Sequence, residues 1–374
     1  MLPKKSYFDY PLVLVVFLLI GIGVVAIFSA GAPLGYLSEG SPYKWGMNQL
    51  KWLVLGVGIL FLMSKIDYHF YRKLDRIIIL VVILSLFMVF APKIGRSIQG
   101  VHRWITLGSF QIQPSELAKI GLIIYVSCSI IRKREKIRSF INGFLPYLLI
   151  ISLIFFLVMI EPDLGSALII AGVGFVLLYC GRARITHMLY VGLLSIIPLY
   201  FSIFEIGYRK NRIEAFLNPE SDPLGIGFHS LHLKIALGAG GLWGLGPGEG
   251  KEKLFYLPTP HTDSIFAVIG EEFGFIGTTL ITLLFVIFTL RGLKIARRAP
   301  DSLGKLLAIG LTVLISGQAI INMGVATVIL PTTGSPLPFI SYGGSSLITC
   351  LTAVGILLNI SNQGKANAGN RNKG

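Results

Sequence analysis

Residues 11–30 read PLVLVVFLLIGIGVVAIFSA, a run without a single charged side chain. An α-helix needs about 20 such residues to cross the hydrocarbon core of a bilayer. Similar apolar runs occupy residues 77–91, 145–160 and, with its flanks, 278–290. The 374-residue chain is 53% hydrophobic and 14% charged, whereas soluble domains are about one quarter charged. The composition therefore predicts an integral membrane protein.

Apolar runs alternate with clusters of Gly, Pro and charged residues, and this alternation predicts ten spanning helices. They are expected near residues 11–30, 49–66, 76–92, 115–131, 142–160, 164–181, 186–204, 263–290, 306–330 and 343–360. The predicted fold class is an all-α polytopic membrane protein, with residues 1–361 as one transmembrane domain and residues 362–374 as a disordered tail. The Ala-Gly-Ala sequence at 30–32 resembles a signal-peptidase site, but the run before it is too long for a signal peptide, so we expect it to remain as the first span.

The positions of Lys and Arg predict the orientation of the spans, because loops on the cytoplasmic side carry an excess of both. With ten spans, the basic clusters fall on one side: Lys4 with Lys5, Arg72 to Arg76, Arg132 to Arg138, Arg182 with Arg184, Arg291 to Lys305 and Lys365 to Lys373. Both termini are therefore predicted to be cytoplasmic. The formal charge of +15 needs no nucleic-acid partner, because the basic runs lack interleaved aromatic residues.

The opposite, extracytoplasmic side receives the segments 31–48, 93–114, 161–163, 205–262 and 331–342. Segment 205–262, between the seventh and eighth predicted spans, is a long outer loop rich in glycine. Loops of this length in compact proteins are usually functional. The three cysteines are isolated in apolar segments and show no spacing typical of a disulfide framework or a zinc site.

Carboxylates at the edges of spans are costly and indicate a function. Glu116 and Lys119 lie three residues apart and can form an ion pair on one helix face, either as a packing device or as the wall of a polar cavity. Asp163 and Asp263 each precede a span, where a carboxylate can cap the helix. A functional role for Asp263 is favoured by its position beside His261, on the side that also holds Arg103, Arg209, Lys210, Arg212 and Lys234. A carboxylate beside cations can take a proton from a hydroxyl while the cations stabilise an anionic leaving group.

Several polar segments, read together and in order, resemble the SEDS family, which includes FtsW, RodA and SpoVE. The matching segments are Arg103-Trp104-Ile105, QPSELAK at 113–119, EPDLGSA at 161–167, 212–219, Tyr256-Leu257-Pro258 with His261-Thr262-Asp263, GEEFG at 270–274, LPTTG at 330–334 and PLPFISYGGSS at 336–346. They extend over nearly the whole chain. The sequence around Gly246-Pro247-Gly248 is more similar to the FtsW division branch than to the RodA elongation branch.

The resemblance implies a ten-span fold and an inverting peptidoglycan glycosyltransferase that polymerises lipid II at the outer face of the bacterial plasma membrane. It also implies a class B penicillin-binding transpeptidase and other divisome or elongasome membrane proteins as partners. By the same resemblance Asp263 matches the catalytic carboxylate, and Arg103, Glu116, Lys119 and Asp163 match polar cavity positions. Further expected substrate-binding residues are Arg209, Arg212, Lys234, His261, Thr262, Ser341, Tyr342, Gly343 and Gly344.

Two departures from the family pattern are visible. Ser264 stands where the family usually has Phe, and Phe228-His229-Ser230 replaces a common Tyr-Gln pattern. A divalent cation, Mg²⁺ or Mn²⁺, is expected on the substrate pyrophosphate, because hard cations suit phosphate oxygens, and no organic cofactor is expected. Two other functions remain open from the residues alone: a flippase that moves lipid II across the membrane, and a non-enzymatic scaffold that activates a transpeptidase.

Overall fold

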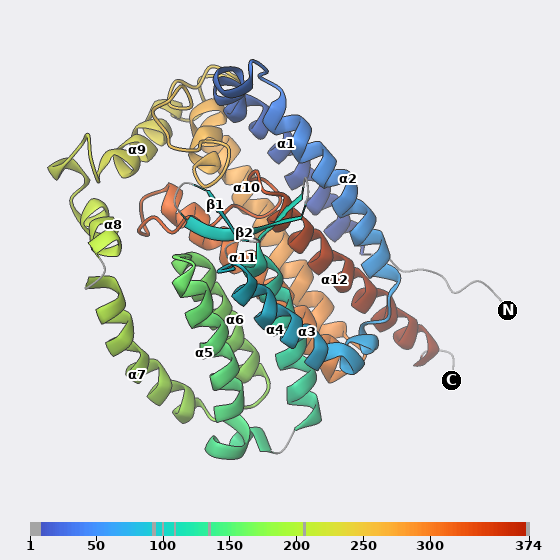
Figure 1. Cartoon of the computed structure of the whole chain (residues 1–374). Helices are drawn as coiled ribbons and strands as arrows, with labels where there is room; N and C mark the ends of the chain where they lie inside the picture. Colours follow the sequence, from blue (N-terminus) through green and yellow to red (C-terminus); the bar gives the residue numbers. More distant parts are fainter. Residues whose placement is uncertain are drawn as a thin grey trace.

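The computed structural model describes residues 9–91, 95–98, 101–107, 110–133, 136–204 and 207–371 (Figure 1). The elements of the first half are α1 (Tyr10–Glu39), α2 (Lys44–Lys65), η1 (Tyr68–Phe70), α3 (Tyr71–Met88), β1 (Gly95–Ile98), β2 (Val101–Leu107), β3 (Phe110–Ile112), α4 (Pro114–Arg132), η2 (Lys136–Arg138), η3 (Phe140–Phe144), α5 (Leu145–Ile160) and α6 (Leu164–Cys180). Those of the second half are α7 (Ile185–Phe204), α8 (Gly207–Leu217), η4 (Pro219–Ser221), α9 (Phe228–Gly240), α10 (Ile265–Arg298), α11 (Ser302–Ala326) and α12 (Gly344–Arg371).

The helices confirm the predicted fold class. In the described part of the chain, 7 helices are long and apolar enough to cross a membrane: α1, α2, α4, η3 with α5, α10, α11 and α12. The apolar helices α6 and α7 are shorter, and α3 carries charged residues in its first turns, YRKLDR. Together these helices coincide with the ten predicted spans, so the chain is a multi-pass membrane protein.

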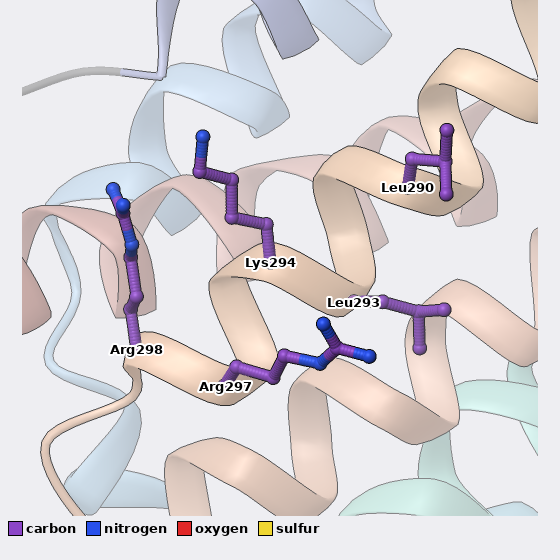
Figure 2. Close-up of a pocket in the computed structure, with 5 residues that line it drawn as sticks. All are labelled: Leu290, Leu293, Lys294, Arg297 and Arg298. Atoms are coloured by element: carbon purple, nitrogen blue, oxygen red, sulfur yellow. The ribbon is translucent and has the colours of Figure 1, made fainter.

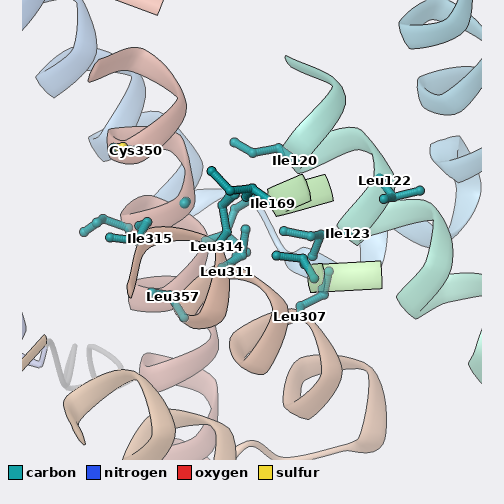
Figure 3. Close-up of a cluster of buried hydrophobic side chains, with 14 of the residues drawn as sticks. Ile120, Leu122, Ile123, Ile169, Leu307, Leu311, Leu314, Ile315, Cys350 and Leu357 are labelled. Atoms are coloured by element: carbon teal, nitrogen blue, oxygen red, sulfur yellow. The ribbon is translucent and has the colours of Figure 1, made fainter. Parts of the chain in front are cut away.

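The core lies where α4, α6, α11 and α12 meet (Figure 3). Ile123 of α4, Ile169 of α6, Leu311 of α11 and Leu357 of α12 are almost completely buried there. Helix α10 and helix α2 lie at the periphery and expose much of their apolar surface. Close approach is maintained by small residues: a Cβ at Gly310 would stand 2.8 Å from Ile123.

Segment 93–114, predicted as a loop, instead holds a three-stranded antiparallel sheet in the order β1-β2-β3. Trp104 pairs with Arg96 on one side of β2, and Ile105 pairs with Ile112 on the other. The signal was present, because β2 is rich in β-branched and aromatic residues. The strands are short, so the apolar pattern of the neighbouring spans dominated the prediction. In Figure 1 the sheet lies at one end of the helices, above α4 and α6.

The predicted outer loop 205–262 contains two helices, α8 and α9. Helix α9 packs against α10 and buries Ser230, Leu233, Ala236 and Gly240, which recur at helical spacing. Gly240 is needed for this packing, since a Cβ there would come within 1.9 Å of the Gly270 carbonyl oxygen. Other glycines of this segment, Gly241, Gly244, Gly246 and Gly248, have positive φ in the turns that follow α9, so the glycine-rich composition serves both helix packing and turns.

The C-terminal end of α12 also differs from the predicted disordered tail. Residues 362–371, expected to be disordered, continue the helix to Arg371. The stretch contains no proline. Gln363 ties this part of α12 to the segment before α3 by donating to Asp67 Oδ1 at 3.0 Å, and it also donates within the helix to Asn359 Oδ1 at 3.1 Å.

Candidate active site

Asp263 lies directly before α10 and is partly exposed. Ser264, not Asp263, is the N-cap residue of α10, and no group in the described ranges donates a hydrogen bond to the Asp263 carboxylate. Its backbone is held firmly, because Asn322 Nδ2 donates to the Asp263 carbonyl oxygen at 3.0 Å and to the Ser335 carbonyl oxygen at 2.8 Å. The backbone that carries the carboxylate is therefore held in place while the carboxylate oxygens stay available.

A second segment, residues 331–343, lies against the residues that precede α10. Ser341 Oγ donates to the Thr262 carbonyl oxygen at 2.7 Å, and the Tyr342 N–H donates to the His261 carbonyl oxygen at 2.9 Å. Gly334 has a φ of 76°, and a Cβ there would lie 3.5 Å from Asp263 Oδ2. Glycine adopts this left-handed backbone conformation without strain, and the missing side chain leaves space beside the Asp263 carboxylate.

His261 is buried between aromatic rings. It stacks on Trp45 at 4.5 Å between centroids and meets the edge of Tyr342 at 5.5 Å. Burial lowers the pKa of His261 to about 4, so the imidazole is neutral at neutral pH. The structure gives this predicted substrate-binding residue a packing role.

The turn between α5 and α6 brings three more polar residues to the same region. Arg103 on β2 donates from Nε to the Glu161 carbonyl oxygen at 2.8 Å and from Nη2 to the Pro162 carbonyl oxygen. Asp163 caps α6, since its Oδ1 accepts from the Ser166 N–H at 3.0 Å. Gln113 Nε2 donates to the other oxygen of Asp163 at 3.3 Å. Strand β2 and helix α6 are thereby locked together.

Glu161 is fully buried, and neither of its carboxylate oxygens has a hydrogen-bond partner within the described residues. Burial raises its pKa to about 8, with repulsion from Asp163 adding to the effect and Arg103 opposing it. The side chain is thus protonated at neutral pH.

Burial and three charged residues from different parts of the fold act on Asp263. The pKa of Asp263 is raised to about 6, mainly by burial and also by Asp163, while Arg103 and Arg212 oppose the rise. Arg212, on α8, donates from Nη1 to the Thr332 carbonyl oxygen at 2.9 Å, which places its guanidinium beside segment 331–343. The predicted residues Arg103, Asp163, Arg212 and Asp263 therefore gather at one site.

Glu116 and Lys119 form the expected ion pair, at 2.8 Å, with almost no exposed surface on either side chain. Lys119 Nζ also donates to Gln318 Oε1 at 3.3 Å, and Gln318 Nε2 donates to the Pro336 carbonyl oxygen at 3.0 Å. This chain of contacts supports segment 331–343 from inside the protein. Sequence reasoning missed Gln318 and Asn322, whose spacing of four on an apolar helix was the available signal.

Other predicted binding residues lie elsewhere. Lys234 is exposed on α9, and the side chain of Arg209 is outside the described part of the structure. The Gly343 N–H donates to Gln49 Oε1 at 3.2 Å, and a Cβ on Gly344 would stand 2.3 Å from Trp52. These two glycines connect α12 to α2.

Ser264, one departure from the family pattern, and the two adjacent glutamates of α10 make contacts within the fold. Ser264 is buried and donates to the Pro258 carbonyl oxygen at 3.5 Å. Glu272 accepts from Lys253 Nζ at 2.6 Å, and Glu271 accepts from the Lys251 N–H at 2.7 Å. Both glutamates belong to α10, and their bonds to Lys251 and Lys253 hold the end of segment 205–262 against this helix. No group of three or more His, Cys, Asp or Glu residues that could hold a metal ion occurs in the described ranges.

Comparison with known proteins agrees with this arrangement. Residues 10–366 match the FtsW/RodA/SpoVE family, described as "Cell cycle protein". The chain is 41% identical over 354 residues to "Probable peptidoglycan glycosyltransferase FtsW" of Geobacter sulfurreducens, covering 95% of each chain. It is 39% identical over 361 residues to "Stage V sporulation protein E" of Bacillus subtilis, covering 96% of this chain and 99% of that protein.

Two solved structures have the same fold. One is a chain of a peptidoglycan synthase complex described as structurally coordinating polymerization and crosslinking, with a TM-score of 0.78, 28% identity and coverage of 96% of this chain and 98% of that chain. The other is the rod shape determining protein RodA of Thermus thermophilus, with a TM-score of 0.70, 25% identity and coverage of 96% and 98%.

Proposed function

Because the chain belongs to the FtsW/RodA/SpoVE family of cell cycle proteins, we propose that it is a peptidoglycan glycosyltransferase. It polymerises lipid II into glycan strands and serves cell division or cell shape. Curated relatives that are similar over almost their whole length carry this activity in their names. The structural observation that carries the assignment is Asp263, whose backbone is held by Asn322 and whose carboxylate has no hydrogen-bond donor in the described chain and lies in the field of two arginines.

In the proposed reaction, Asp263 is the general base. Its carboxylate takes the proton from the 4-hydroxyl of the acceptor sugar, the hydroxyl oxygen forms a bond to the anomeric carbon of the donor, and the bond from that carbon to the pyrophosphate breaks with inversion. A pKa raised to about 6 suits this task, because a base is most effective when its pKa approaches the working pH.

The leaving group is undecaprenyl pyrophosphate, and Arg212 and Arg103 offset its developing negative charge. We assign Lys119 to support of segment 331–343 and not to the leaving group, because Glu116 and Gln318 already bind its ammonium. A divalent cation, Mg²⁺ or Mn²⁺, would be brought by the pyrophosphate of the substrate.

The substrate also explains why the site lies at the ends of spans. Both reactants are amphiphiles, so their lipid tails stay in the bilayer while their sugars and pyrophosphates reach Asp263 at the N-terminal ends of α6 and α10. By the positive-inside rule this end faces outward and both termini are cytoplasmic, in the plasma membrane. A crosslinking enzyme, a class B penicillin-binding transpeptidase, is the proposed partner, since a structural relative belongs to a complex that couples polymerization to crosslinking.

The decisive experiment measures polymerisation of lipid II by the purified chain with its partner transpeptidase. Asp263→Asn is expected to lower the rate by about 10²- to 10⁴-fold. Asp222→Asn is the matched control, because Asp222 is an exposed aspartate of segment 205–262 whose carboxylate, among the described residues, accepts from the N–H groups of Gly225 and Ile226 alone. A wild-type rate for Asp263→Asn would refute the assignment of the base.

The same assay separates the alternatives. A flippase would move lipid II without forming glycan strands when no other glycosyltransferase is present. A scaffold would stimulate the transpeptidase equally with Asp263 or Asn at that position.

A further inference from the structure

A cavity of about 400 Å³ lies at the C-terminal end of α10, far from Asp263 at its other end (Figure 2). It is lined by Leu290, Leu293, Lys294, Arg297 and Arg298. This spacing of three and four residues places them along one side of the helix. In Figure 2 the guanidinium of Arg297 extends along α10 towards Leu293, so cationic and apolar groups border the same space.

The cations of this cavity carry uncompensated charge. Within the described residues, Lys294, Arg297 and Arg298 form no salt bridge, whereas Arg291, one turn earlier, binds Asp9 with an N–O distance of 2.7 Å. No acidic side chain lines the cavity. Cations stabilise the C-terminus of a helix through its dipole, but a concave cluster of three also creates a local positive potential that attracts anions.

The cavity lies at the level of lipid headgroups. Helix α10 is interrupted at Gly274 by φ 65° and ψ −162°, and the straight part that follows, to Arg298, is about 36 Å long at 1.5 Å per residue. The hydrocarbon core is about 30 Å thick. A helix that enters the core near Phe275 therefore leaves it near Lys294, and the two arginines follow in the polar layer.

An apolar stripe leads to the cavity from the membrane side. Leu280, Leu283, Ile287 and Leu290 of α10 recur at helical spacing and expose between 41% and 61% of their surface. This stripe faces lipid and ends at the three cations. It offers a path for acyl chains, which a soluble anion would not use.

We propose that this cavity binds the phosphate headgroup of an anionic glycerophospholipid, with the acyl chains on the stripe of α10. The three cations bind the phosphate oxygens, and Leu290 and Leu293 contact the upper part of the chains. The site is separated from Asp263 by the length of α10, so it is independent of the polymerase function. It makes one end of α10 responsive to the lipid composition of the leaflet.

The test is lipid retention by the full-length protein, purified in a mild detergent and measured by native mass spectrometry after addition of dioleoyl phosphatidylglycerol or dioleoyl phosphatidylcholine. We expect wild-type protein to retain phosphatidylglycerol preferentially. The triple variant Lys294→Gln/Arg297→Gln/Arg298→Gln should lose about 10- to 100-fold of this affinity, since each cation contributes on the order of 1 kcal/mol near an anionic lipid surface.

The matched control is Arg72→Gln/Lys73→Gln/Arg76→Gln, which removes three exposed cations from α3 and should leave retention unchanged. The charge-preserving variant Lys294→Arg/Arg297→Lys/Arg298→Lys should bind as the wild type does. If the triple Gln variant does not fold, Arg297→Gln alone should weaken binding by about fivefold.

Three outcomes would overturn the proposal: equal retention of both lipids by the wild type, wild-type retention by the folded Gln variants, or equal losses in the control. An additional arm uses inorganic phosphate as competitor. Displacement of the lipid by millimolar phosphate would show that the cavity takes a free anion and that the stripe adds nothing.

Discussion

Asn322 offers the sharpest test of how the site is built, because one buried amide holds both segments that meet there. Its Nδ2 donates to the carbonyl oxygens of Asp263 and Ser335, and its Oδ1 is buried without a partner in the described structure. Replacement by leucine, which has nearly the same shape, removes both bonds and leaves two carbonyl oxygens unsatisfied.

Each buried polar group left unpaired costs about 1–3 kcal/mol. Removal of the unpaired Oδ1 offsets part of this, so Asn322→Leu should destabilise the fold by roughly 1–4 kcal/mol. The larger effect should be on the reaction, because a displacement of about 1 Å at a catalytic group can lower the rate on the order of 10²-fold. We therefore expect a modest fall in melting temperature and a large fall in polymerisation rate per folded molecule.

The control is Asn359→Leu. Asn359 is 5% exposed against 1% for Asn322, and it also binds backbone groups, donating to the Ser64 carbonyl oxygen and accepting from the Tyr68 N–H. It lies about 22 Å along α12 from the helix start near the site. Asn359→Leu should lower the melting temperature similarly and keep the rate per folded molecule. Equal activity losses in the two variants, or no loss in Asn322→Leu, would refute the positioning role.

Three further predictions concern charged groups. The polymerisation rate should rise with pH through about 6 and level off above it, because Asp263 acts only when ionised and burial raises its pKa to about 6; a rate that is flat between pH 5 and 8 would contradict this. Glu161→Gln should match the wild type in melting temperature near pH 4 but be more stable than the wild type at pH 8, because a carboxyl whose folded-state pKa is raised from 4.5 to about 8 loses stability as pH rises from its ordinary pKa to the raised one; thermal melts at both pH values are the measurement. Glu116→Gln or Lys119→Met alone should lower the free energy of unfolding by about 3–5 kcal/mol, because each leaves a buried charge unpaired. The double variant should lose clearly less than the sum of the two single losses. Additive losses in a double-mutant cycle would show that the pair is not coupled.

The spans could be predicted from sequence because a lipid environment requires long apolar runs, and each run is visible locally. The basic clusters were equally visible, and so was the ion pair of Glu116 and Lys119, since both residues lie on one helix. The strands between residues 95 and 112 and helix α9 were not separated from loops, because the strands are short and α9 is stabilised by its packing against α10.

The polar network beneath the site was beyond local reasoning for another reason. Gln318 and Asn322 are ordinary polar residues of α11 in the sequence, and their importance arises only because segment 331–343 folds back over that helix. The same applies to His261: its position beside the proposed base favoured a chemical role, while Trp45, more than 200 residues away in the chain, makes it a packing residue.

Asp163 and Asp263 show how a shift of one residue separates a structural from a reactive carboxylate. Both precede a span, and the sequence allows either to cap its helix. Asp163 is the N-cap of α6 and accepts from the Ser166 N–H, whereas α10 begins one residue later relative to its aspartate, so that Ser264 takes the N-cap position. Asp263 thereby lies beyond the reach of the first free N–H groups of the helix. Its oxygens keep no donor in the described chain, its pKa rises instead of falling, and the register of the α10 start supplies the proton acceptor that the proposed reaction needs.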